Sequence, residues 1–90
     1  MKLFVMAVRD RAANVYGAPY CVPAVGAAVR GFGDEINNRQ LPNGQANVLA
    51  QHPEDFDLFQ LGEYDDATAS FVLLERPRQV AVGKDLVRKD

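Results

Sequence analysis

The chain has 90 residues, of which 48% are hydrophobic and 24% charged, and its formal net charge at pH 7 is −2. This length supports one domain, residues 1–90, with a single modest core, and the hydrophobic content argues against a disordered chain. No apolar run approaches the roughly 18 residues of a membrane-spanning helix, and the N-terminus lacks the basic flank of a signal peptide. We therefore expect a soluble, unprocessed protein without membrane partners.

The first predicted element is a strand from Lys2 to Val8, whose apolar residues fall on both alternating faces, as in a strand near the centre of a sheet. Arg9-Asp10-Arg11 ends this strand with charge. Residues 12–19 are predicted to form a loop, because they contain asparagine, glycine and proline. The rings of Tyr16 and Tyr20 could stack on unpaired bases beside arginines, or they could anchor the loop against the core.

A main helix is predicted over residues 23–37, where apolar residues recur at spacings of three and four and include Phe32 and Ile36. Proline suits the first turn of this helix, and asparagine suits its end. Arg30 lies near the edge of the apolar stripe. It is either a rim residue whose aliphatic part covers apolar surface, or a phosphate contact on the helix surface.

A turn is predicted at Leu41-Pro42-Asn43-Gly44, followed by a short helix over residues 45–51 that Asn43 would cap. His52 precedes a proline, so we assign it a cap or turn role rather than a catalytic one. A second strand is predicted over residues 56–64, because its apolar residues occur at both even and odd positions, as in a strand that is covered on one face and partly on the other.

The remaining residues predict a hairpin. Residues 65–68 supply turn chemistry, and residues 70–75 form a third strand antiparallel to the second. Arg76-Pro77-Arg78 should interrupt that strand, because proline cannot serve a central ladder, and residues 79–82 would add a short edge strand. The tail, residues 84–90, is either a final helical turn or frayed.

These elements predict an α+β fold in the order β-α-β-β, with a small mixed sheet of three or four strands and one main helix on one face. If the first two strands are parallel, the crossover between them should be right-handed. One core should contain Phe4 or Leu3, Val25, Val29, Phe32, Ile36, Leu58 or Phe59, and Phe71 or Val72.

Nothing in the sequence indicates an enzyme. The chain contains no G-x-G-x-x-G, Walker-type, G-x-S-x-G or C-x-x-C motif, so we expect no catalytic residue and no cofactor. Cys21 is the single cysteine, which excludes an internal disulfide and fits a reducing cytoplasm. One cysteine and one histidine supply too few ligands for a structural zinc site, and the acidic residues lack the spacing of a calcium loop. No metal is therefore expected.

The charge is unevenly distributed. Residues 1–51 and 67–90 each carry five basic and three acidic side chains, whereas residues 52–66 carry six acidic side chains and no lysine or arginine. The chain is therefore basic at both ends and acidic in the middle. A local basic surface can exist although the total charge argues against a tight, sequence-blind DNA coat.

Two spaced motifs resemble a known family. Residues 52–66, which read H-P-E-D-F followed by L-G-E-Y-D-D, resemble the centre of the small non-structural protein of the gokushoviruses, single-stranded-DNA phages of the microvirus group. Residues 16–20, Y-G-A-P-Y, and the A-x-R-x-F pattern of residues 28–32 resemble its aromatic-proline turn and helix. The resemblance covers roughly residues 1–75. It implies a role in phage DNA metabolism, through binding of single-stranded DNA or control of the switch to its synthesis and packaging.

We therefore expect a protein of the host cytoplasm that binds single-stranded DNA weakly per chain and gains affinity as a homodimer or larger homo-oligomer, formed through the uncovered sheet face or an edge strand. The alternative is a regulatory adaptor that contacts phage or host replication or packaging proteins through acidic residues around Glu63 and Asp66. The candidate DNA contacts are Arg9, Arg11, Tyr16, Tyr20, Arg30, Arg39, Arg76 and Arg78.

Overall fold

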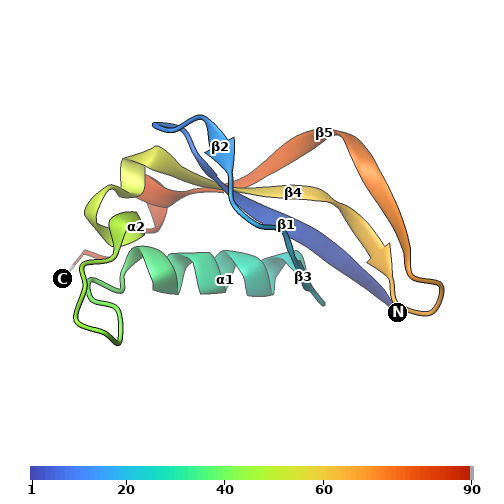
Figure 1. The fold of residues 1–90 in the computed structure, drawn as a ribbon, viewed down its shortest axis with the longest axis horizontal. Helices are drawn as coiled ribbons and strands as arrows, with labels where there is room; N and C mark the ends of the chain where they lie inside the picture. The colour runs from blue at the N-terminus through green and yellow to red at the C-terminus, as the bar shows by residue number, and fades with distance from the viewer. Residues whose placement is uncertain (90) are drawn as a thin grey trace.

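The computed structural model describes residues 1–89 and shows an α+β fold, in which one main helix covers one face of a curved sheet (Figure 1). The predicted fold class is confirmed. The strands are β1 (Lys2–Asp10), β2 (Val15–Tyr16), β3 (Tyr20–Val22), β4 (Phe56–Asp65) and β5 (Ser70–Val82). The helices are α1 (Val25–Ile36) and the short α2 (Val48–Gln51), with two 3-10 turns, η1 (Pro53–Asp55) and η2 (Gly83–Leu86).

β1 lies inside the sheet, as its two apolar faces predicted. It pairs along its length with β4, and it also pairs with β3 near its start and with β2 at its end. Every pairing among the described residues is antiparallel, so no parallel crossover arises, and the sheet has five strands rather than three or four. β2 and β3 were missed because strands of two and three residues are too short to show a periodic pattern.

β4 and β5 form the predicted hairpin. Asp65 Oδ1 accepts a hydrogen bond from the backbone N–H of Ala67 at 2.9 Å, and Ala69 at the end of the turn has a φ of 57°. An acidic turn residue that bonds the backbone two positions later is typical of such turns. The turn chemistry read from the sequence therefore fixes where the chain reverses.

The interruption predicted at Arg76-Pro77-Arg78 is wrong, because β5 continues to Val82 as one strand of 13 residues. The strand bulges instead of ending. Its pairing with β4 passes directly from Leu73 to Arg78, so residues 74–77 have no partner in β4. Pro77 lies in this bulge, where its missing N–H removes no ladder hydrogen bond.

α1 covers the sheet through Ala28, Phe32 and Ile36, which are buried against Met6 of β1 and Leu58 of β4. Their spacing of four places them on one side of the helix. The predicted burial of Phe32 and Ile36 is confirmed. The helix begins two residues later and ends one residue earlier than predicted, because Ala24 is extended and the chain leaves the helix at Asn37.

The expectation that Phe71 or Val72 would join this core is wrong, because their side chains are 61% and 68% exposed. Figure 1 shows that the hairpin of β4 and β5 projects past the first turn of α1. The described residues span 42 × 25 × 24 Å, so the fold is elongated. Of the β5 side chains, only Val80 and Ala81 pack against the main core.

Asn47, rather than the predicted Asn43, caps α2. Its side-chain oxygen accepts from the N–H of Leu49 at 3.2 Å, and its amide nitrogen donates to the carbonyls of Glu35 and Asn38, both at 2.9 Å. Asn47 thus joins α2 to the end of α1. The predicted cap or turn position of His52 is confirmed, since it lies between α2 and η1.

Gly83 is required where β5 passes into η2. A Cβ atom at this position would collide with the carbonyl oxygens of Pro53 and Phe56 and would approach Ile36 Cδ1 to 3.1 Å. We expect Gly83→Ala to lower the free energy of unfolding by at least about 1 kcal/mol, because neighbouring backbone must shift. Gly31→Ala, where an added Cβ meets nothing within 4 Å, should instead raise it by about 0.5–1 kcal/mol. Urea unfolding followed by circular dichroism measures both, and equal effects would contradict this account.

Candidate nucleic-acid interface

Arg9 and Tyr16 form an aromatic and basic cluster at the end of β1. The Arg9 guanidinium lies 5.8 Å from the centroid of the Tyr16 ring and donates to Asn14 Oδ1 at 2.8 Å. The Tyr16 ring in turn contacts Phe59 edge to face, with centroids 5.4 Å apart. Tyr16 remains 43% exposed. Sequence reasoning proposed these two residues separately, and the structure brings them together.

A tight turn between β1 and β2 produces this cluster. Asp10 Oδ1 accepts from the N–H of Ala13 at 3.1 Å, and Asn14 adopts a φ of 57°, which asparagine tolerates better than most residues. The register that follows places Tyr16 directly opposite Arg9. Cross-strand partners lie on the same sheet face, so the ring and the guanidinium meet.

Arg11 has a different environment from Arg9. Its Nε lies 3.0 Å from Asp57 Oδ2, and its NH2 group donates to the carbonyl of Glu54. Asp57 is buried, and its Oδ1 has no partner among the described residues. Arg11 therefore neutralises a buried carboxylate, and this ion pair competes with any contact to a phosphate.

Tyr20 does not join Tyr16. It pairs with Met6, whose side chain belongs to the core beneath α1, whereas Tyr16 pairs with Arg9. Met6 and Arg9 are an odd number of residues apart, so their side chains point to opposite faces. Burial raises the pKa of the Tyr20 hydroxyl. The two predicted stacking residues thus lie on opposite faces of the sheet and cannot form one platform.

The remaining candidate arginines lie on three separate parts of the surface. Arg76 is exposed in the bulge of β5, and Arg78 donates to Gln60 Oε1 at 2.8 Å. Arg30 is exposed on α1, and Arg39 follows the helix. None of the ion pairs formed within residues 1–89 involves Arg9, Arg30, Arg39, Arg76 or Arg78.

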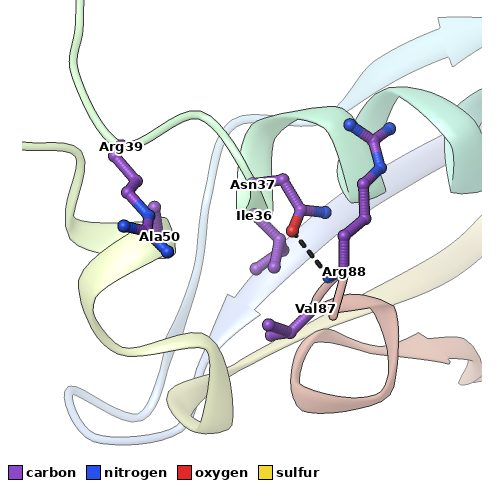
Figure 2. A pocket seen from close by; sticks show the side chains of 6 residues that line it. All are labelled: Ile36, Asn37, Arg39, Ala50, Val87 and Arg88. Carbon is purple, nitrogen blue, oxygen red and sulfur yellow. Dashed lines mark hydrogen bonds between the residues drawn. The ribbon is translucent and has the colours of Figure 1, made fainter. Parts of the chain in front are cut away.

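Arg39 lines a pocket with a volume of about 230 Å³, together with Ile36, Asn37, Ala50, Val87 and Arg88 (Figure 2). Asn37 Oδ1 accepts the backbone N–H of Arg88 at 2.8 Å, and the Arg88 guanidinium lies 2.7 Å from Asp34 Oδ1. The pocket forms where the chain after η2 returns to the end of α1. Sequence reasoning missed Arg88 because no local pattern indicates that return.

The acidic residues near the hairpin turn are partly neutralised by the chain itself. The amino group of Met1 donates to Asp66 Oδ1 at 2.8 Å, and Lys2 Nζ lies 3.8 Å from Glu63. The hydrogen bond to the Asp66 side chain raises the pKa of the Met1 amino group, and the negative charge of Asp66 raises it further. This segment is consequently less negative at its surface than its sequence suggests.

One group of possible metal ligands occurs at the turn after α2. Ligand atoms of His52, Glu54 and Asp55 lie within 4.8 Å of one another. His52 and Glu54 are exposed, and their facing atoms are 3.7 Å apart. Three side chains on an open turn leave most of the six or more oxygen ligands of a hard cation to water. The geometry gives no reason to assign a metal here.

No helix among the described residues has the length and apolar character to cross a membrane. A family model described as Phage ORF5 protein matches residues 3–86. No curated protein and no solved structure matches the chain.

Proposed function

This chain belongs to the phage ORF5 protein family and is therefore a phage protein; we propose that it binds single-stranded DNA. This binding would take place during viral DNA replication in the host cytoplasm. The resemblance to the gokushovirus non-structural protein suggests a role in the switch to single-strand synthesis and packaging. A protein that occupies displaced single strands reduces their use as templates for a second strand.

The availability of the arginines carries this proposal. Five of the six candidate arginines make no ion pair within residues 1–89, and only Arg11 has a carboxylate partner. These guanidinium groups can contact phosphates without first breaking an ion pair, although Arg9 and Arg78 each donate one hydrogen bond to a neutral side chain. The net charge of −2 limits long-range attraction, so affinity per chain should be modest.

Two features favour a single strand over a duplex. The exposed ring of Tyr16 sits beside a guanidinium group, an arrangement that can stack on a base only when the base is unpaired. In addition, α1 carries one basic residue, Arg30, and two acidic residues, Asp34 and Glu35. A helix with this charge is poorly suited to the major groove of a duplex.

The alternative function, an adaptor that binds a replication or packaging protein through its acidic segment, receives less support. The side chains of Asp65 and Asp66 are 38% and 48% exposed, but the positively charged Met1 amino group lies beside both carboxylates. Replacing Glu63, Asp65 and Asp66 with serine should abolish capture of a basic partner if the adaptor function holds, and it should leave DNA binding unchanged or stronger if our proposal holds.

The direct test is an anisotropy titration of labelled single-stranded and duplex oligonucleotides of the same sequence at 50 mM salt. We expect binding of the single strand and at least tenfold weaker binding of the duplex. Failure to bind the single strand at this salt concentration, or equal affinity for the two forms, would overturn the proposal.

Loss of the Tyr16 ring should weaken this binding. We expect Tyr16→Leu to cost about 1–3 kcal/mol of binding free energy, the usual value for one base–aromatic contact. Tyr16→Phe should bind like the unchanged protein because it keeps the ring. Tyr20→Leu, on the opposite face, is the matched control and should have no effect. Equal losses for the Tyr16 and Tyr20 variants would contradict the assignment of the stacking face.

A further inference from the structure

The outer edge of β5 presents unpaired backbone. In the strand order β2-β1-β4-β5, β5 pairs only with β4 among the described residues. All residues from Ser70 to Gln79 are exposed. An edge strand carries a row of free N–H and C=O groups, which readily pair with another strand.

The apolar side chains of this edge lie on both faces. Phe71, Val72 and Leu73 are 61%, 68% and 68% exposed, and Leu74 is 40% exposed. Alternation along the strand puts Phe71 and Leu73 on one face and the other two on the opposite face. Covering one sheet face would therefore leave half of the run in water, whereas a strand added to the edge contacts both faces.

The geometry limits the available edge to a short segment. The hairpin turn precedes Ser70, and the bulge of residues 74–77 follows Leu73. Charge and proline, the usual protection of an edge strand, occur in the bulge at Glu75, Arg76 and Pro77, whereas Phe71–Leu74 contain neither. The segment without charge or proline is Ser70–Leu74, which includes Leu74 as the first residue of the bulge, and Val72 is its middle residue.

We infer that this segment is the homodimer interface, where β5 pairs antiparallel with β5 of a second copy across a twofold axis at Val72. A twofold axis perpendicular to the sheet at Val72 pairs each residue with the residue equally far from Val72 on the other side, so paired side chains point to the same face of the sheet. Val72 then faces Val72 of the second copy, and Phe71 faces Leu73 of the second copy. The two sheets become one continuous sheet, and the apolar side chains meet on both of its faces.

Charge supports a second copy as the occupant. In this register the bulge of one chain lies beside the hairpin turn of the other, because Arg76 and Thr68 are each four residues from Val72. The turn carries Asp66, next to Asp65 at the end of β4, and the Met1 amino group offsets part of their charge. The bulge carries Glu75 and Arg76, and Arg76 makes no ion pair within residues 1–89. An Arg76 side chain therefore lies near the acidic turn of the other copy at both ends of the paired segment, which a register that brings two turns together would not achieve. The pairing does not depend on the proposed binding of DNA.

Sedimentation equilibrium between about 1 and 100 µM tests the association without nucleic acid. We expect the unchanged chain to reach twice its mass of 9.9 kDa. Val72→Asp places like charges face to face, so this variant should sediment with the mass of the monomer over the whole concentration range. Val48→Asp is the matched control, because Val48 is a valine with 53% exposure on α2, and its dimer should be unaffected.

A mixture tests the register itself. Val72→Asp alone and Val72→Lys alone should both sediment as monomers with unchanged circular dichroism, and their equimolar mixture should recover the dimer, since opposite charges then meet at the axis. A monomer of the unchanged chain at 100 µM, a dimer of either charged variant alone, or a mixture that stays monomeric would overturn this pairing. Loss of DNA binding without loss of the dimer would overturn only the proposed function.

Discussion

Replacing Phe32 with alanine should lower the free energy of unfolding by about 3–5 kcal/mol, the usual cost of removing a buried aromatic side chain. Phe32 is 3% exposed and lies between Ala28 and Ile36 in the only helix that covers the sheet within residues 1–89. Small domains have about 5–15 kcal/mol of stability in total. The variant should therefore be largely destabilised, as a lower urea midpoint will show.

Val48→Ala is the comparison for this prediction. Val48 is 53% exposed on α2, so its truncation leaves no cavity and should change the free energy of unfolding by no more than about 0.5 kcal/mol. Equal losses for Phe32→Ala and Val48→Ala would show that α1 does not supply the main core.

Replacing Arg11 with alanine should lower the free energy of unfolding by about 2–3 kcal/mol. The substitution leaves the buried carboxylate of Asp57 without its partner at 3.0 Å, and an uncompensated buried charge is costly. The Arg11 side chain is 48% exposed, so solvent reduces the loss below that of a fully buried pair.

The double variant Arg11→Ala/Asp57→Asn separates this cause from a simple loss of packing. The asparagine side chain introduced by Asp57→Asn carries no charge, so no unpaired charge is buried in the double variant. Asp57→Asn should therefore restore at least half of the free energy of unfolding lost with Arg11→Ala. If Asp57→Asn adds a further loss to that of Arg11→Ala, the ion pair does not stabilise the fold in the way its geometry indicates.

Local patterns predicted the parts of this fold that depend on neighbours in the chain. The spacing of Phe32 and Ile36 identified the covered face of α1, and the acidic residues near Asp65 identified the hairpin turn. Both arise from interactions within a few residues, where helical periodicity and turn chemistry act directly.

The exposed run of β5 was misassigned to the core for a reason that sequence does not reveal. A helix of 12 residues is about 18 Å long at the usual rise per residue, and the fold extends over 42 Å. α1 therefore cannot cover the whole hairpin. Apolar residues on both faces of a strand look the same in the sequence whether a helix, another strand or a second chain covers them.

The sequence identifies the residue types that could contact DNA, but it does not show which other residues of the chain each of them contacts. Arginines can be identified from the sequence, but the ion pair of Arg11 with Asp57 joins residues 46 positions apart. The opposite faces of Tyr16 and Tyr20 follow from strand register, which depends on two strands too short to predict. Distinguishing available arginines from structural ones required the three-dimensional structure.

The salt dependence of single-strand binding tests most directly whether the available arginines hold DNA. Each phosphate contact to a single strand contributes about 0.7 to the slope of log Kobs against log salt concentration. We predict a clear decrease of affinity between 50 and 200 mM salt, a slope smaller by about 0.7 for Arg9→Ala, and an unchanged slope for the Arg11→Ala/Asp57→Asn variant. A flat dependence for the unchanged protein, or equal changes of slope for the two variants, would contradict the proposed interface.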